Sequence, residues 1–379
     1  MAKDTGSAND TGVFMRSVLQ RIATGPELSK DITLEEARQG MSLVLDGKVH
    51  PVQAALFLIA LRMKRETDEE NKGILEAVRD ATVRTQAAVD EVVDIADPYD
   101  GCNRTLPAAP FLPAVLSACG VATVSHGVES MGPKYGVTHR QVLRAAGAEV
   151  NSMPEQAAQR IGNKETGWSY IDQSRFCPKL HDLAELRTLI VKRPAIATVE
   201  VMAGPVCGRR KTHLITGYVH KPYPRIYAML ARHAGFDSAL LVRGTEGGVI
   251  PSLRQTGKFF FYRDRGDNSE EQSIEVSPTD LGIEQELRAV PLPEDLPPAA
   301  HTPDRTGMKG DVATAAQAAA QAGLEALDGK PGPTRDALTY GAAACLWHLG
   351  RSESMAAAAQ SVRAVIDSGS ALAHFRSAP

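Results

Sequence analysis

The sequence lacks the marks of several protein classes. Its five cysteines are scattered along 379 residues without a C-x-x-C pair, which argues against a disulfide framework or a cysteine metal site and favours buried thiols. No run approaches the roughly 18 uncharged apolar residues of a membrane span. The polar start, MAKDTGSANDTG, has no apolar core of a signal peptide. These absences predict a cytoplasmic protein with no membrane partner.

The chain also has no large excess of positive or negative residues. The formal net charge is −3, so no overall basic field indicates a nucleic-acid partner. The near-neutral total hides two segments, however. Between 179 and 232, ten Lys or Arg face three Asp or Glu, a balance of +7, whereas 264–295 carries ten acidic residues and two Arg, a balance of −8. A solvated face explains such runs as well as a binding surface does.

What is present is an ordinary globular composition, with 43% hydrophobic and 23% charged residues, enough for one large or two medium domains. Residues 1–11 are polar and are expected to form a disordered tail. Residues 12–87 show helical spacing of apolar positions and predict a small helical domain. Thr33 followed by Glu36 is the pattern of a capping box, and Thr67 is expected to cap a later helix.

From residue 91 the pattern changes to short Val- and Ile-rich runs that alternate with helical stretches. This alternation predicts an α/β domain over 91–379, with a mixed, mostly parallel sheet flanked by helices. The segment 258–276 is expected to add an antiparallel pair of strands. Three helices are predicted after a Pro-rich link, over 310–327, 334–348 and 353–368.

One loop of this domain raises a question about function. The stretch DIADPYDGCNRT, residues 94–105, follows an apolar run and precedes a helix-like segment, a common position for a phosphate-binding loop. Such loops usually hold several glycines, and this one holds only Gly101. Pro98 has no N–H to donate, Tyr99 places a ring where a phosphate would approach, and the carboxylate of Asp97 is expected to repel an anion.

The order of the segments resembles that of the anthranilate phosphoribosyltransferase superfamily. The resemblance covers about residues 12–373 and is carried by four stretches: LDGKVHPVQAALFLIALRMKRETDEE, HGVESMGPKYGVTHRQVLRAAGAEV, IEVSPTDLGI and GPTRDALTYGAAACLWHLG. It implies a helical domain to which about 178–195 contributes, a large α/β domain, a ligand cleft between them, and a homodimer formed through the helical domain. The family transfers ribose 5-phosphate from phosphoribosyl pyrophosphate to anthranilate, with magnesium.

The chain departs from this family where the family's motifs carry chemistry. The phosphate loop GTGGDG is matched only by Asp100 and Gly101, and the N-x-S-T element that follows it is replaced by Leu106 to Ala109. The family's HGNR keeps His126 and Gly127, but its Asn and Arg become Val128 and Glu129. The positions of the magnesium-binding carboxylates hold Val249 and Ile250, neither of which binds a hard cation.

Basic residues persist despite these losses. Lys134, Arg187 and Arg193 match cations of the family that the resemblance places in one cleft, and the Gly-containing turn GPVCGRRK adds three more. Neighbouring tyrosines (Tyr218, Tyr223 and Tyr227) suit stacking on bases. The candidate ligand site comprises Lys134, Arg187, Lys192, Arg193, Arg209, Arg210, Lys211, His126, Gly127, Asp100 and Gly101. No residue is assigned to catalysis or to a metal.

The favoured hypothesis is a pseudoenzyme that binds a phosphate-rich ligand in a basic interdomain cleft and uses no cofactor. Nucleic acid is favoured as this ligand over a phosphorylated small molecule. The alternative is a diverged phosphoribosyl- or glycosyltransferase, in which Asp100 and Glu246 are the only carboxylates to orient Mg²⁺ or a water. A third option is an interaction protein that uses the dimer and the acidic segment 264–295. The basic side chains should converge in the cleft if they bind a polyanion, and scatter if they form a solvated face.

Overall fold

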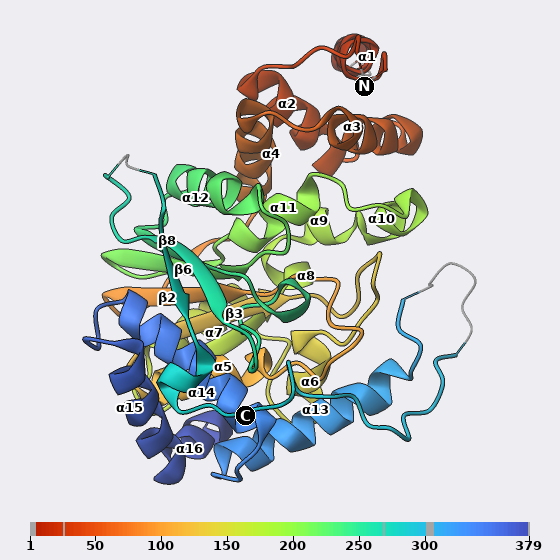
Figure 1. Cartoon of the computed structure of the whole chain (residues 1–379). Coiled ribbons are helices and arrows are strands. Elements are labelled where there is room, and N and C mark those ends of the chain that lie inside the picture. Colours follow the sequence, from red (N-terminus) through yellow and green to blue (C-terminus); the bar gives the residue numbers. More distant parts are fainter. Residues whose placement is uncertain (1–4, 26, 268–269, 301–306, 378–379) are drawn as a thin grey trace.

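The computed structural model describes residues 5–25, 27–267, 270–300 and 307–377. A seven-stranded sheet lies between the N-terminal helices, drawn at the top of Figure 1, and the C-terminal helices, drawn at the bottom. A helical N-terminal region followed by an α/β domain with a mixed, mostly parallel sheet is the predicted fold class, and it is confirmed. No helix in these described ranges is long and apolar enough to cross a membrane.

The N-terminal region consists of four helices, whose bounds are α1 (Thr5–Ile22), α2 (Leu34–Leu45), α3 (Pro51–Lys64) and α4 (Asp68–Asp80). Both predicted caps are present: Thr33 with Glu36 forms a capping box at α2, and Thr67 with Glu70 does so at α4. The disordered tail expected over 1–11 is wrong for residues 5–11, which belong to α1, and residues 1–4 lie outside the described part. No proline interrupts residues 5–11, so the helix of the apolar segment extends back through them.

The sheet has the strand order β4-β3-β2-β6-β7-β8-β9. The strands are β2 (Glu91–Ala96), β3 (Thr123–Gly127), β4 (Trp168–Asp172), β6 (Lys211–Gly217), β7 (Ser238–Val242), β8 (Gly257–Tyr262) and β9 (Gln272–Val276). Neighbours from β4 to β7 pair in parallel, and β8 and β9 are antiparallel, as the sequence predicts for 258–276. A separate two-stranded sheet joins β1 (Thr85–Gln86) to β5 (Val206–Cys207).

Both faces of the sheet are covered, and alternate residues of each strand enter different cores. In β2, Val93 and Ile95 join the core beneath the C-terminal helices, whereas Val92 and Ala96 join the core that includes the N-terminal helices. The helical region therefore shares its core with one face of the sheet. The short helix α10 (Ala184–Ile190) also packs against α3, so chain from the predicted 178–195 segment reaches the helical region.

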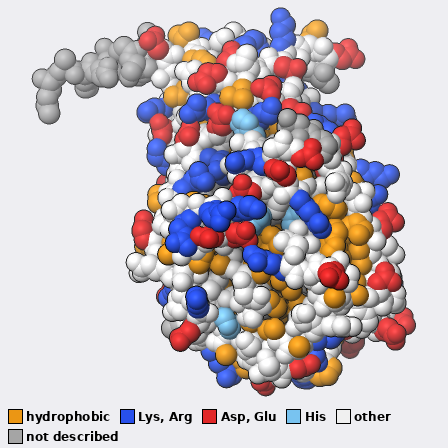
Figure 2. All heavy atoms as spheres, turned by 90° about the vertical axis from the view of Figure 1, so that its left-hand side faces the viewer, with side chains coloured by type: hydrophobic (Ala, Val, Ile, Leu, Met, Phe, Trp, Pro, Cys, Tyr) orange, Lys and Arg blue, Asp and Glu red, His pale blue; other side chains and the backbone are white. Residues whose placement is uncertain are grey.

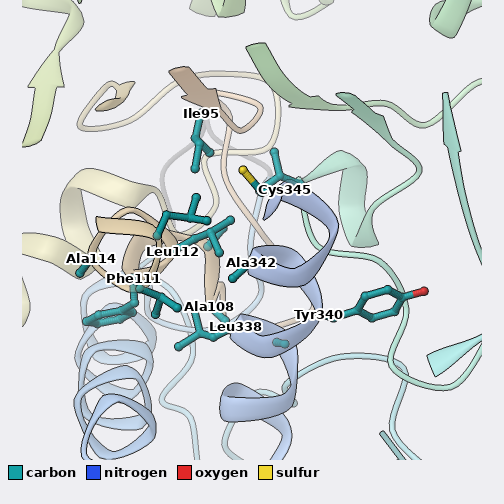
Figure 3. Packing of buried hydrophobic residues seen from close by; sticks show 14 of the residues in the cluster. Ile95, Ala108, Phe111, Leu112, Ala114, Leu338, Tyr340, Ala342 and Cys345 are labelled. Atoms are coloured by element: carbon teal, nitrogen blue, oxygen red, sulfur yellow. The ribbon is translucent and has the colours of Figure 1, made fainter. Parts of the chain in front are cut away.

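The core beneath the C-terminal helices includes residues of six helices. These are α5 (Leu112–Ala118), α6 (His139–Ala145), α13 (Val312–Leu327), α14 (Pro333–His348), α15 (Met355–Asp367) and α16 (Ser370–Arg376). Figure 3 shows Phe111 and Leu112 lying beside Leu338 and Ala342 of α14. Packing is close here: a methyl group added at Gly323 of α13 would collide with the Phe111 ring.

Further helices connect the strands along the chain, and the sequence predicted only some of them. They are α7 (Pro154–Gly162), α8 (Gln173–Phe176), α9 (Pro178–His181), α11 (Ile196–Val199) and α12 (Tyr223–Ala234). α12 ends at Gly235, which caps it with φ +88°. The strand β4 has no counterpart among the predicted strands.

Candidate functional site

A cleft of about 650 Å³ lies between α3, the chain around α10 and α11, and the edge of the sheet where the parallel strands end. Its walls come mainly from the loops that follow β2, β6 and β7, namely 98–105, 217–223 and 243–247. Ligands in open α/β sheets bind at this carboxyl edge because successive loops leave the strands there. Its volume is in the range of small-molecule and nucleotide sites.

The cleft is basic. Eight Lys or Arg line it against three carboxylates, which gives a balance of +5 before histidine is counted. The cations are Arg62, Arg104, Lys134, Arg187, Arg193, Arg243, Lys258 and Arg288, and the carboxylates are Asp100, Glu200 and Glu246. Three of the sequence-predicted cations, Lys134, Arg187 and Arg193, therefore do meet in one cleft.

These three cations already have partners within the chain, two carboxylates for three positive charges. Arg187 and Glu200 form a buried bidentate ion pair at 2.6 and 2.8 Å. Burial opposes the charge on Arg187, but the Glu200 carboxylate outweighs it and raises the pKa of the guanidinium. Arg193 donates to Oδ2 of Asp100 from Nε (2.9 Å) and Nη2.

Lys134 joins two loops of the cleft wall. Its Nζ donates to the carbonyls of Gly101 (3.0 Å) and Glu246 (3.1 Å) and lies 3.4 Å from Oδ1 of Asp100. An ammonium group has three hydrogens, and these three contacts use them. Lys134 therefore serves as a brace between the two loops in the free protein.

Three other arginines of the cleft remain without a carboxylate partner among the residues that the structure describes. Arg104 lies in the loop after β2, Arg243 follows β7, and Arg288 lies in the irregular segment before α13. All three are exposed. They are the cations free to meet an anionic ligand.

The predicted convergence of all the basic residues is wrong. Arg209, Arg210 and Lys211 precede or begin β6, whereas Gly217 at the other end of β6 lines the cleft. Six residue steps along a strand span about 20 Å, so these cations lie at the opposite, amino edge of the sheet. Arg209 pairs there with Asp90 at 2.8 Å, and Arg210 and Lys211 line a second hollow together with Arg351. Lys192 is exposed and is not part of the cleft wall.

Charges of both signs mix on the side of the molecule seen in Figure 2. Lys and Arg side chains there form a band interrupted by Asp and Glu. Such a surface gives no continuous positive field for a polyanion to follow. It favours the solvated-face interpretation for the basic residues outside the cleft.

His126 and Gly127 have structural surroundings. His126 is buried on β3, where Nδ1 bonds to the hydroxyl of Tyr99 and Nε2 lies 2.9 Å from Oδ1 of Asp94. Gly127 ends the same strand opposite Asp172. Neither residue lines the cleft, and the prediction that they contact ligand is not supported by their positions.

The loop after β2 differs from expectation at two residues. Asp97 does not face the cleft: it accepts hydrogen bonds from Nε2 of His139 and the amide of Val249, both at 2.8 Å. The expected repulsion of an anion by Asp97 is therefore wrong. Tyr99 is buried in the cleft wall, and burial raises the pKa of its hydroxyl, which stays protonated.

Gly101 is required for packing and backbone conformation. It adopts φ +73°, and a Cβ at this position would stand 2.6 Å from the carbonyl oxygen of Val137. The glycine therefore lets loop 98–105 pass close to the chain at 136–137. This role does not involve a ligand.

The carboxylate of Glu246 is bound by the loop after β2. Its Oε2 accepts from the amide of Asn103, and its Oε1 accepts from the amide of Arg104 and the hydroxyl of Thr105, all at 2.9 Å. Glu246 itself has φ +55°, an uncommon conformation for a residue with a side chain. The loop therefore does hold an anion in this structure, and the anion is part of the chain.

The residues do not fit the magnesium site that the resemblance implies. Val249 is buried and apolar, and Ile250 offers no oxygen ligand from its side chain. Asp100 and Glu246 are engaged by cations and amides as described above. Within the described ranges, no three His, Cys, Asp or Glu side chains are grouped so as to hold a metal ion.

The aromatic residues near the cleft are unequal in exposure. Tyr218 and Tyr227 are buried, and burial raises the pKa of Tyr218 to about 12. Tyr223 is half-buried and lies 6.3 Å from the exposed ring of His220, centroid to centroid. Tyr223 and His220 thus form the part of the wall on which a flat ligand could stack.

Five cations of the cleft were missed by the sequence prediction: Arg62, Arg104, Lys258, Arg243 and Arg288. Arg243 directly follows β7 and Arg104 lies in the loop after β2, positions that predict the carboxyl edge of a parallel sheet. Arg288 lies in an irregular segment and has no such signal.

Comparison with known proteins gives matches in sequence. Residues 16–82 match a family model described as the helical bundle domain of a glycosyl transferase family. An uncharacterized protein of Aquifex aeolicus (strain VF5) is 29% identical over 59% of this chain and 65% of its own length. Anthranilate phosphoribosyltransferase of Bradyrhizobium sp. (strain ORS 278) is 24% identical over 96% of this chain and 97% of its own.

Solved structures share the fold over nearly the full length. Anthranilate phosphoribosyltransferase from Thermus thermophilus superimposes with a TM-score of 0.70 at 19% identity, covering 96% of this chain and 97% of the other. The Saccharomyces cerevisiae enzyme, solved in complex with PRPP and Mg, gives 0.72 at 14% identity, with 96% of each chain covered. At these identities the likeness shows the fold.

Proposed function

This chain belongs to the anthranilate phosphoribosyltransferase superfamily, and we propose that it binds a phosphate-rich ligand, with nucleic acid as the favoured ligand. We also propose that it does not catalyse the transfer to anthranilate. The observation that carries the proposal is the unpaired positive charge of the cleft. Arg104, Arg243 and Arg288 face a cavity whose other five cations each lie within 4 Å of a carboxylate of the chain.

The binding chemistry follows from these side chains. Guanidinium groups bind phosphate oxygens in bidentate fashion and keep their charge at any physiological pH. Tyr223 and His220 offer ring faces beside them. A positive groove with an adjacent stacking surface is the common arrangement for single-stranded nucleic acid.

Loss of the transferase reaction is supported by the residues at the metal positions. The apolar side chains of Val249 and Ile250 cannot neutralise a leaving pyrophosphate through magnesium, and Asp100 is held by Arg193 and Lys134.

The two edges of the sheet provide a matched test. Fluorescence anisotropy with a labelled single-stranded oligonucleotide should show binding at low salt that weakens as salt rises. The variant R104A/R243A/R288A removes three cations from the cleft, and R209A/R210A/K211A removes three from the amino edge. The cleft variant should lose at least about tenfold in affinity and reduce the salt slope by about 2, since each phosphate contact contributes about 0.7 for single strands.

The amino-edge variant carries the same change in net charge and should remain within about threefold of wild type. Equal losses in both variants would show a diffuse charge effect and contradict a cleft site. No binding at low salt would refute the nucleic-acid proposal outright.

A second candidate is a diverged phosphoribosyl- or glycosyltransferase, favoured by a scaffold that matches the enzymes over 96% of the chain. Thermal-shift measurements with phosphoribosyl pyrophosphate, with and without magnesium, separate the two. A magnesium-dependent rise in melting temperature favours the transferase, and no shift favours the binding protein. The expected homodimer and cytoplasmic location stay predictions, the first of which sedimentation analysis would check.

A further inference from the structure

Glu246 occupies the donors that a phosphate would use in the loop after β2. Two successive amides, those of Asn103 and Arg104, and the hydroxyl of Thr105 all point to one carboxylate. Successive amides that converge on one point form an anion-binding concavity in many proteins. The loop therefore retains the geometry of an anion site although it lacks most of the glycines of such loops.

Several features separate this contact from an ordinary link between loops. The carboxylate reaches the site from a backbone held at φ +55°, and the carbonyl of Glu246 is fixed separately by Lys134. The side chain can therefore leave the amides while the main chain keeps its brace. Arg104, Thr105 and Glu246 all line the cleft, so the donors would open directly to a ligand there.

We propose that residues 103–105 form a second anion site of the cleft, which the carboxylate of Glu246 keeps closed in the free protein. A phosphate group enters by displacing this carboxylate, so that one anion replaces another on the same three donors. Glu246 thus lowers the affinity for phosphate and selects ligands with enough further contacts, such as those to the free arginines, to displace it. This inference rests on the proposed function in that both require a phosphate-bearing ligand in the cleft.

Calorimetric titration with inorganic pyrophosphate, without metal, tests the inference. E246A removes the internal anion and should bind pyrophosphate at least about tenfold more tightly than wild type. E246Q removes only the charge and keeps one acceptor oxygen, so a smaller gain of at least about threefold is expected. E353A is the matched control, because Glu353 is exposed, lies outside the cleft and gives the same change in net charge.

The control decides between a local and a general effect. E353A should stay within about twofold of wild type. Equal gains in E246A and E353A, or no gain in either Glu246 variant, would overturn the proposal. If E246A melts at a much lower temperature than wild type, the E246Q titration decides, because its side chain has nearly the same size.

A second measurement locates the bound anion. In amide-resolved NMR spectra of E246A, pyrophosphate should shift the signals of Asn103 and Arg104, whereas in wild type it should shift them only at much higher concentration. Shifts elsewhere in the cleft without these two would contradict the assignment.

The outcome is separable from that of the proposed function. Loss of oligonucleotide binding in R104A/R243A/R288A, without a pyrophosphate gain in E246A, would keep the function and remove this inference. A pyrophosphate gain in E246A, with no oligonucleotide binding by wild type, would keep the anion site and remove nucleic acid as the ligand.

Discussion

Both edges of the sheet carry clusters of cations, but their surroundings differ. At the carboxyl edge, Arg187 and Glu200 are buried together, and Asp100 holds Arg193 and Lys134. At the amino edge, Arg209 pairs with Asp90, and both side chains are more than half exposed. The Arg187–Glu200 pair at the cleft edge is therefore part of the buried fold, whereas the Arg209–Asp90 pair at the amino edge lies in solvent.

This difference shows that positive charge along a sequence does not define a binding site. What defines it is which cations remain unpaired where the backbone forms a cavity. The proposed site contains such arginines: Arg243 directly follows β7, Arg104 lies in the loop after β2, and Arg288 lies in an irregular segment. The densest basic run, Arg209 to Lys211, lies at the opposite end of β6.

Breaking one ion pair at each edge should give the largest contrast. R187A leaves the Glu200 carboxylate buried without its partner, so the free energy of unfolding should fall by about 3–5 kcal/mol. R209A removes an exposed pair and should cost less than about 1 kcal/mol. Urea denaturation of both variants measures the difference.

The double variant R187M/E200Q is the control for this first contrast. It removes both charges together and should recover at least half of the R187A loss, because no uncompensated charge remains. Similar losses in R187A and R209A would show that burial does not separate the two edges.

Two glycines with positive φ give the next contrast. Gly101 at the cleft and Gly120 at the amino edge have φ +73° and +81°, but an added Cβ would stand 2.6 Å from the Val137 carbonyl oxygen at Gly101 and meet nothing within 4 Å at Gly120. G120A should cost about 1–2 kcal/mol for backbone conformation alone. G101A should cost about 2–5 kcal/mol, because a steric term of about 1–3 kcal/mol is added.

Thermal and urea unfolding of both alanine variants check this prediction. Equal costs would mean that the loop at 98–105 can move away from residues 136–137. In that case the close approach of the two segments would not fix the cleft wall.

Much of the fold could be predicted from the sequence. Capping residues such as Thr33 and Thr67 mark helix starts by local chemistry, and Val- and Ile-rich runs mark β2, β3, β6 and β7. The strand β4 was missed because its sequence, WSYID, has a single β-branched aliphatic residue, and its burial depends on the helices α5, α7 and α8 that pack against it.

The site was less predictable, for two different reasons. The partner of Arg193 is Asp100, 93 residues earlier, and no local pattern encodes such a pair. The position of Arg209 to Lys211, by contrast, was available in the sequence: residues before a parallel strand lie at the opposite edge from residues after it. At Arg209 to Lys211 charge density is therefore a poorer guide than strand topology.

Buried histidines at the amino edge give the smallest contrast, in pH dependence. Ser238 at the start of β7 joins His213 and His348 through hydrogen bonds of 2.8 and 2.9 Å. Burial, with help from the neighbouring His213 and Arg263, lowers the pKa of His348 to about 3. In the unfolded chain the same ring takes up a proton near pH 6.5.

Between about pH 6.5 and 3 the unfolded state therefore binds more protons at His348 than the folded state, so stability falls as pH falls through this window. Between pH 7.5 and 5 this histidine should account for a loss of about 2 kcal/mol. H348Q keeps a hydrogen-bonding group for Ser238 but cannot be protonated, so its unfolding free energy should fall by about 2 kcal/mol less over this range. H220Q, at an exposed histidine of the cleft, should keep the wild-type profile, and parallel profiles for H348Q and wild type would place the acid sensitivity elsewhere than in this amino-edge pair.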